Sequence, residues 1–223
     1  NYNVVVGDEA GTAITTGDSN VFVGYQSGDA TTTSDSNVGV GRGTLTTNIL
    51  SDHNTAIGNG ALFTHNQASS IDSYNTAVGS NAGGAVTTGI QNTLIGGLAG
   101  DALTDADYNV AVGSYALTSD TLGSRSVAIG YAALEDQNFT TATNSYNIGI
   151  GWNTGGAITT GTQNTLIGGL AGDALTTGTN NVAIGYNTLS TEDAHGSNVA
   201  IGRQALENQN AGAEAYNVAI GSL

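Results

Sequence analysis

The chain lacks proline, cysteine, methionine and lysine, and its 223 residues include only three basic side chains, Arg42, Arg125 and Arg203. Without cysteine it can form neither disulfides nor thiolate metal sites, so the sequence does not indicate a redox compartment. With 18 acidic residues and a formal net charge of −15, it lacks the basic patches that bind nucleic acids or anionic membrane surfaces. It has no apolar run of membrane-spanning length. We therefore expect no nucleic-acid partner and no membrane insertion.

A five-residue motif is repeated along the whole chain: Asn, a β-branched residue, a variable residue, Val or Ile, and Gly. Twelve copies begin with Asn, at Asn3, Asn20, Asn37, Asn54, Asn75, Asn92, Asn109, Asn147, Asn164, Asn181, Asn198 and Asn217, and one begins with Ser126. Successive copies follow at a spacing of 17, and every fourth spacing is longer, at 21 twice and then 19. Such a period is typical of a solenoid, in which each repeat forms one coil stacked on its neighbours.

The motif itself predicts short parallel strands. We number its first residue as position zero, so that positions one and three are the β-branched residues and position four is an invariant Gly. Side chains two residues apart share one face of a strand, and we expect positions one and three to fill the coil. The Gly implies a positive φ or a backbone approach too close for a Cβ atom. The frequent Gly and the spacing of two exclude an amphipathic helix.

The Asn at position zero has two possible structural roles. Its amide either bridges successive coils in a ladder or only caps the turn of its own coil. We therefore interpret the twelve Asn residues as structural.

A longer period is superimposed on the coil. Position eight follows the order Gly, Gly, Leu, Leu, and the fourth coil is always the long one. The true unit is thus a super-repeat of four coils, with 72 residues at 3–74 and 75–146 and 70 residues at 147–216, followed by the start of a further coil at 217–223. We predict one continuous array over 1–223. Because the chain starts and stops in mid-repeat, we interpret it as an excerpt of a longer protein.

Position two suggests self-association. In the second coil of each super-repeat it holds a bulky residue, Phe22, Leu94 or Leu166, where other coils mostly hold Ala or Gly. If positions one and three face inward, these three residues face outward and need a partner. We therefore expect a homo-oligomer with these residues at the subunit contact, and a parallel trimer is the form that we favour.

The motif resembles repeats of known fibrous proteins. SVAIG at 126–130 and NVAIG at 181–185, 198–202 and 217–221 resemble the heads of trimeric autotransporter adhesins of the YadA-like group. The forms NTAIG at 54–58 and NTAVG at 75–79 are similar to repeats of bacteriophage tail fibres. The resemblance implies a left-handed parallel β-roll with three chains, exposed on a virion or cell surface and used for attachment. The 17-residue coil and the four-coil super-repeat depart from the adhesin pattern and favour the tail fibre.

We therefore expect a non-enzymatic structural and attachment protein, the shaft of a phage tail fibre. A bacterial surface adhesin or extracellular filament is the alternative within this class. A polysaccharide-degrading β-solenoid enzyme would need a groove with two carboxylates at a catalytic separation, and the acidic residues follow no such pattern.

Exposed aromatic residues are the first candidate binding surface. Position five holds Tyr25, Tyr131, Trp152 and Tyr186, just after the Gly corner, where we expect them to lie outside. Such a row could stack on the sugars of a host glycan, or it could form contacts between neighbouring chains. The long segments 63–74, 135–146 and 207–216 are either binding loops or tolerated surface insertions.

Other chemistry has weaker support. His53, His65 and His195 have no second ligand at a regular offset, and no cofactor is expected. The Asp residues at 101, 105 and 107 could supply oxygen ligands to Ca²⁺, but we interpret them in the first place as a solvated acidic face. An ice-binding face would require a Thr ladder in every coil, whereas pairs such as Thr15-Thr16 follow only some coils.

Overall fold

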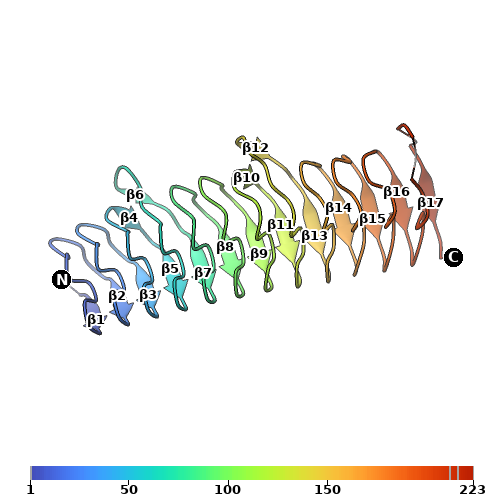
Figure 1. Ribbon diagram of the computed structural model, residues 1–223. Coiled ribbons are helices and arrows are strands. Elements are labelled where there is room, and N and C mark those ends of the chain that lie inside the picture. The colour runs from blue at the N-terminus through green and yellow to red at the C-terminus, as the bar shows by residue number, and fades with distance from the viewer. Residues whose placement is uncertain (1, 211, 215, 223) are drawn as a thin grey trace. The chain divides into compact units, whose positions relative to one another are not determined.

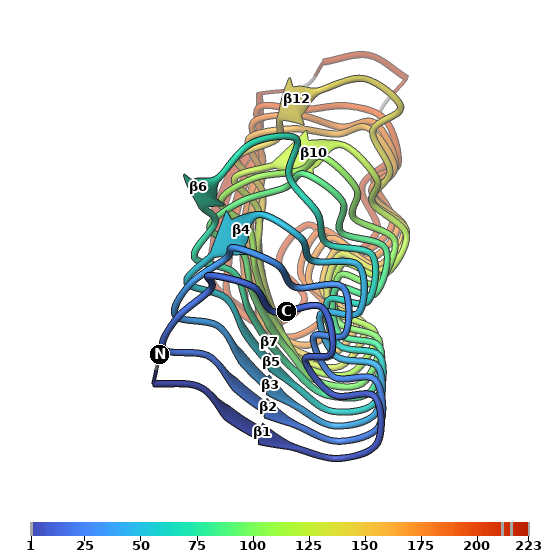
Figure 2. The same ribbon diagram turned by 90° about the vertical axis from the view of Figure 1, so that its left-hand side faces the viewer.

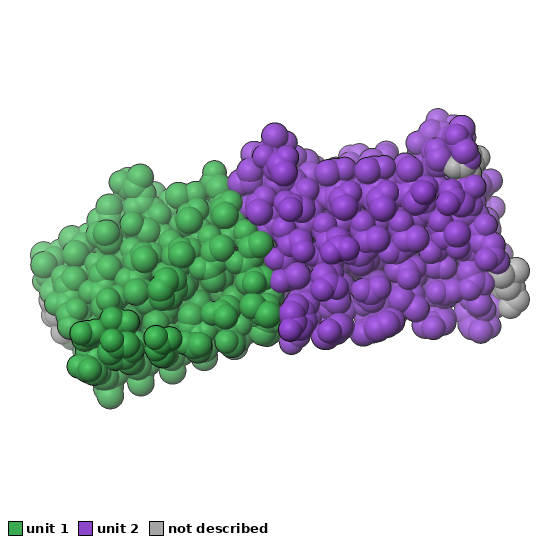
Figure 3. All heavy atoms as spheres, in the orientation of Figure 1, with its two compact units in different colours: residues 1–109 green, residues 110–223 purple. Residues whose placement is uncertain are grey.

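The structure is a computed structural model that describes residues 2–210, 212–214 and 216–222. The chain divides into two compact units, with unit 1 ending at Asn109 and unit 2 beginning at Val110 (Figure 3). Each unit is a stack of coils. The described residues contain no helix with the length and apolar character of a membrane span.

Unit 1 contains six three-residue strands, one for each coil (Figure 1). They are β1 (Val4–Val6), β2 (Val21–Val23), β3 (Val38–Val40), β5 (Thr55–Ile57), β7 (Thr76–Val78) and β8 (Thr93–Ile95). Two shorter strands, β4 (Ser51–Asp52) and β6 (Ile71–Asp72), pair in parallel beside them.

Unit 2 repeats the arrangement with seven three-residue strands. They are β9 (Val110–Val112), β11 (Val127–Ile129), β13 (Ile148–Ile150), β14 (Thr165–Ile167), β15 (Val182–Ile184), β16 (Val199–Ile201) and β17 (Val218–Ile220). The short strands β10 (Gly123–Ser124) and β12 (Thr143–Asn144) form the second pair.

Equivalent positions of the motif are aligned from coil to coil within each unit. Figure 2 shows the strands β1, β2, β3, β5 and β7 stacked side by side. Val4 pairs with Val21, and Ile150 pairs with Ile167, in parallel and without any shift of register. Parallel strands cannot be joined by a tight hairpin, so each coil must travel around the stack before it returns. The prediction of an all-β parallel β-solenoid with about thirteen turns, repeated about every 17 residues, is confirmed. The left hand of the roll and the trimer remain predictions.

The strands bury the opposite face from the one expected. Positions one and three are partly exposed; Ile57 and Ile95, for example, keep 39% and 38% of their surface. Position two points inward, and Phe22, Leu94 and Leu166 are completely buried within the chain. The prediction that these three residues face outward to a subunit contact is therefore wrong.

The narrow interior explains this reversal. A Cβ atom added to Gly28 at position eight would lie 2.5 Å from the Phe22 ring, and one added to Gly155 would lie 2.8 Å from Leu166. The bulky residue at position two thus occupies space that Gly at position eight leaves free. Where position eight is Leu, as at Leu134, position two of the next coil is Gly149. The four-coil rhythm is a packing code for a core with room for one large side chain at a time.

The Gly at position four has both properties that its sequence position suggests. Gly130, for instance, has a φ of +133°. A Cβ atom at this position would lie 2.2 Å from the carbonyl oxygen of Gly151 in the next coil. These glycines let the corners of successive coils stack directly, and a side chain there would force the coils apart.

The long fourth coils carry the second set of strands. In the first two super-repeats the additional residues pair with the preceding coil through β4 and β6 or through β10 and β12. In the third segment, 207–216, residues 211 and 215 lie outside the described residues. Each segment ends in an exposed residue with positive φ, at Tyr74, Tyr146 and Tyr216.

Candidate binding surface and the ladders that position it

The Asn residues at position zero connect neighbouring coils. The backbone N–H of Asn37 donates to Oδ1 of Asn20 at 2.9 Å, and Asn54 donates in the same way to Asn37. The same side chains also bind within their own coil, since Nδ2 of Asn20 donates to the carbonyl of Ser34 at 2.8 Å. Both roles considered from the sequence are thus combined in one buried amide. Each amide fixes its coil against the next one.

One coil of unit 2 has a different arrangement. Ser126 takes the place of Asn, and its hydroxyl lies 2.5 Å from that of Ser145 and accepts from Nε2 of Gln137 at 2.8 Å. The Gln137 amide also accepts from Nδ2 of Asn147. Gln137, which lies later in the same coil, therefore takes the place of the missing Asn side chain.

The candidate aromatic row lies on a backbone ladder at the corner that follows the recurring Gly. In unit 2 the carbonyls of Tyr131, Trp152, Gly169 and Tyr186 each accept from the N–H of the next coil at 2.9–3.0 Å. Parallel coils are about 4.8 Å apart, so position-five side chains are presented at that interval. The ladder therefore holds three aromatic side chains in a fixed order on consecutive or alternate coils.

These aromatic side chains are exposed, as expected. Tyr131, Trp152 and Tyr186 keep 53%, 57% and 54% of their surface. The coil between those of Trp152 and Tyr186 has Gly169 at position five. A Cβ atom on Gly169 would lie 3.5 Å from the Tyr186 ring, so this ring leans toward the space beside Gly169. Sequence reasoning missed Tyr115, at position six of the preceding coil, whose ring meets Tyr131 edge to face at 5.8 Å. Aromatic residues recur at position five but not at position six, so no sequence pattern pointed to Tyr115.

The fourth residue of the expected row lies in unit 1, in different surroundings. Tyr25 is 41% exposed, and the guanidinium of Arg42 lies 5.9 Å from the centre of its ring. The negative charge of Glu9 raises the pKa of the Tyr25 phenol. Its neighbours at position five are Asp8, Arg42 and Asn59, so the corner of unit 1 is polar and that of unit 2 aromatic.

A second surface is the outer face of the strands. Positions one and three hold only Val, Ile and Thr, with no charged residue in any of the thirteen coils. Val40 and Ile167 each keep 36% of their surface. In a chain with a net charge of −15, this uncharged face is an unusual surface.

Position eleven, which was not singled out from the sequence, carries a largely buried polar pair in every super-repeat. The third and fourth coils place there Asn48 and His65, Asp120 and Gln137, or Glu192 and Gln209, whereas the first two coils mostly place Ile, Val or Leu. The two members of each pair are one coil apart in the sequence. The same four-coil alignment that exposed the Gly/Leu order at position eight would have found them.

The pair at Asp120 is fully connected. Its carboxylate accepts from the N–H groups of Gly123 and Phe139 at 3.0 and 3.1 Å, and from Nε2 of Gln137 at 2.6 Å. Burial raises the pKa of Asp120, while these hydrogen bonds act against the rise. The carboxylate thus serves as a buried cap for the turn that follows it.

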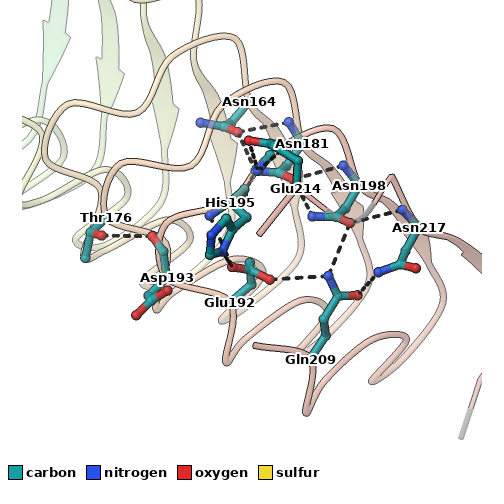
Figure 4. A network of polar contacts seen from close by, with 11 residues as sticks. Asn164, Thr176, Asn181, Glu192, Asp193, His195, Asn198, Gln209, Glu214 and Asn217 are labelled. Atoms are coloured by element: carbon teal, nitrogen blue, oxygen red, sulfur yellow. Dashed lines mark hydrogen bonds and ion pairs between the residues drawn. The ribbon is translucent and has the colours of Figure 1, made fainter. Parts of the chain in front are cut away.

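Glu192 plays the same part in the third super-repeat (Figure 4). Its carboxylate accepts from the N–H of His195 at 3.1 Å and from Nε2 of Gln209 at 3.2 Å, and it lies 3.0 Å from Nδ1 of His195. With the exposed Asp193, these side chains are close enough to share a cation. Because the Glu192 carboxylate is already bound by protein groups, the cluster is explained as a cap.

His65 differs from its two glutamine counterparts. It is completely buried, and neither ring nitrogen has a hydrogen-bond partner. Burial lowers its pKa to about 4, and the main chain of Thr87 acts in the opposite direction. The imidazole is therefore neutral at physiological pH, in a place where the other super-repeats have a connected amide.

The acidic residues considered for Ca²⁺ lie apart. Among the described residues, the cluster at Glu192 is the one group of three His, Asp or Glu side chains near enough to share an ion. Asp105 accepts from the Thr88 hydroxyl and Asp107 from the N–H of Ile90, so both join neighbouring coils. The structure does not bring Asp101, Asp105 and Asp107 together as a cation site.

Comparisons of the chain with known protein families, with curated proteins and with solved structures found no match. Its function must therefore be argued from its own surfaces.

Proposed function

We propose that the protein is a structural, non-enzymatic attachment protein, a β-solenoid shaft that presents binding groups at fixed intervals. The support is the continuity of its ladders. Within each unit, strands and corner carbonyls bond each coil to the next, and buried Asn amides add to these bonds except at Ser126, where Gln137 takes part instead. Repeat stacks of this kind gain stability from each neighbour interface and resist local opening.

The binding surface of this proposal is the aromatic row Tyr131, Trp152 and Tyr186, and its ligand is a cell-surface glycan. The observation that carries the proposal is that three half-exposed aromatic side chains lie on one hydrogen-bonded ladder. Aromatic faces stack on the apolar faces of sugars, and three such rings at fixed intervals can contact successive sugars of one glycan.

The assembly that we propose is a parallel homotrimer, with a revised interface. Strand positions one and three replace the buried Phe22, Leu94 and Leu166 as its contact residues. Chains with a charge of −15 repel each other, and the face without charge is the surface on which they can meet at least cost. Three copies of a weak glycan site would also bind with avidity.

The resemblance of the repeat carries the finer assignment. We propose a phage tail fibre, located on the virion, with a bacterial surface adhesin or extracellular filament as the second candidate. Both place the protein outside a cell and use it for adhesion.

A glycan array with the purified chain tests attachment. We expect binding to a subset of glycans, and a loss of at least tenfold for Trp152→Ala and Tyr186→Ala. Tyr146→Ala removes an equally exposed tyrosine outside the row and should leave binding unchanged. Equal losses in all three variants, or no glycan bound by the unaltered chain, would count against the row.

Analytical ultracentrifugation tests the trimer. We expect three chains per particle, and monomers when Ile57→Glu and Ile95→Glu place two carboxylates on the uncharged face. Asn59→Glu adds a charge at the exposed corner instead and should keep the trimer. A monomeric unaltered chain would overturn the interface.

A further inference from the structure

A surface hollow in unit 1 has the features of a second binding site, separate from the aromatic row. It has a volume of about 330 Å³ and lies at the polar corner, where Gln26, Arg42, Asn59 and Asn81 line it on successive coils. Its size is within the range of small-molecule sites.

Two adjacent glycines create the hollow. Position six has positive φ in each of the first twelve coils, and most of them place a side chain there, such as Glu9, Gln26 or Asn81. The third and fourth coils have Gly43 and Gly60 instead, with φ of +63° and +68°. Since larger residues adopt the same backbone in other coils, the backbone alone does not require these glycines.

The groups around the hollow have unused binding capacity. Arg42 is the single arginine of unit 1, and its guanidinium makes no ion pair with a described residue. Among the described residues, the side-chain amides of Asn59 and Asn81 have no hydrogen-bond partner, and Oδ1 of Asn81 lies over Gly60. Phe63 adds an aromatic face that is 43% exposed.

This set of groups matches one class of ligand. A guanidinium without an ion-pair partner, even one that lies against an aromatic ring as Arg42 does, can bind a carboxylate through two parallel hydrogen bonds. Amides bind hydroxyl groups, and an aromatic ring covers the apolar face of a sugar. Glu9 accepts from Nε2 of Gln26 at 2.7 Å and keeps that end of the hollow negative. A carboxylate is therefore directed to Arg42 and the hydroxyls to the amides. We propose that this hollow binds a carboxylated pyranose, a hexuronate unit of a surface polysaccharide.

The test uses methyl β-D-glucuronoside and methyl β-D-glucoside, which differ in the carboxylate alone. Binding to the full chain is followed by ligand-observed NMR titration at low ionic strength. We expect the glucuronoside to bind at least tenfold more tightly than the glucoside, and added salt to weaken it.

Two variants and one matched control locate the site. Arg42→Gln removes the guanidinium, and Gly43→Asn fills the hollow with a residue that position six accepts elsewhere; each should weaken glucuronoside binding at least tenfold. Arg203→Gln removes the same charge at position five of unit 2 and should change binding less than twofold. Unchanged circular dichroism would show that the variants fold.

The outcomes separate this site from the aromatic row. Trp152→Ala should leave glucuronoside binding intact, so the row can fail without affecting the hollow, and the reverse also holds. Equal affinity for the two glycosides, equal competition by sodium acetate, or full binding by Arg42→Gln would overturn the proposal.

Discussion

Units 1 and 2 are built from the same coil but differ in how their polar groups are used. In unit 2 the buried pair Asp120 and Gln137 is fully hydrogen-bonded, whereas the ring nitrogens of the equivalent His65 of unit 1 have no hydrogen-bond partner. The surface chemistry of the corner differs as well, because unit 2 has an aromatic ladder there and unit 1 has the polar hollow around Arg42.

The difference shows that backbone ladders and side-chain content vary independently. The coils repeat because their corners and strands stack, which requires Gly at position four and small or matched residues inside. Positions five, six and eleven can then change without altering the stack, and these positions hold both the candidate binding surfaces and the buried polar pairs that differ between the units.

The largest effect is expected from the core that both units share. Phe22→Ala should lower the free energy of unfolding by about 4 kcal/mol, and Leu166→Ala in unit 2 by about 3 kcal/mol, because each leaves a cavity in the narrow interior. Val21→Ala, on the partly exposed face beside Phe22, should cost about 1 kcal/mol. Chemical denaturation at one fixed protein concentration measures all three. If Val21→Ala cost more than Phe22→Ala, the observed facing of the strands would be contradicted.

A smaller effect should distinguish the units in acid. The folded pKa of His65, about 4, is below the unfolded value of 6.5, so the unfolded chain takes up the proton first as the pH falls. Above pH 6.5 His65 is neutral in both states and does not lower the free energy of unfolding. Between pH 6.5 and 4 its protonation in the unfolded chain lowers the free energy of unfolding by about 3 kcal/mol.

His65→Gln tests this difference, because glutamine occupies the equivalent place at Gln137 and Gln209. Denaturation curves between pH 7 and 4 should show a weaker acid dependence for His65→Gln than for the unaltered chain. His53→Gln replaces an exposed histidine and serves as the control. Identical pH profiles for all three chains would contradict the assignment to His65.

The smallest of the three effects concerns the Asn ladder. Asn92→Ser gives unit 1 the residue that unit 2 has at Ser126, but without a glutamine to fill the space. Oδ1 of Asn92 accepts a hydrogen bond from the N–H of Asn109, and its Nδ2 donates to the carbonyl of Ala106. The substitution should therefore lower the free energy of unfolding by about 2 kcal/mol. Asn59→Ser, at an exposed position, should cost less than about 0.5 kcal/mol. A ladder substitution as mild as the exposed one would contradict a stabilising role for these buried amides.

Much of the fold followed from periodicity in the sequence. Strict recurrence of Gly and β-branched residues was enough to predict parallel strands, the coil and the four-coil unit, because backbone stacking constrains those positions directly. The facing of the strands did not follow, since alternation at spacing two is the same whichever side is buried. Only the match between Phe22 and Gly28 across the interior decides it.

The candidate site was predictable to a smaller extent. Exposure of Trp152 and Tyr186 followed from their place after the Gly corner, and the structure agrees. The hollow at Arg42 could not be foreseen, because it depends on two missing side chains at position six and on the direction in which Phe63 and Asn81 lean. The residues that line such a site come from different coils, so they are at least about one coil length apart in the sequence.

The complementarity between positions two and eight also limits how such a chain can change its length. A recombination that removed the first or the second coil of a set would bring two large side chains, or two gaps, against each other, whereas loss or gain of a full set of four coils preserves the order of large and small residues. The segments 91–104 and 163–176 are identical and lie one super-repeat apart, as unequal crossing-over would leave them. Core packing therefore restricts loss or gain of the first two coils of a set, whereas a complete set of four coils can be lost or gained without disturbing the interior.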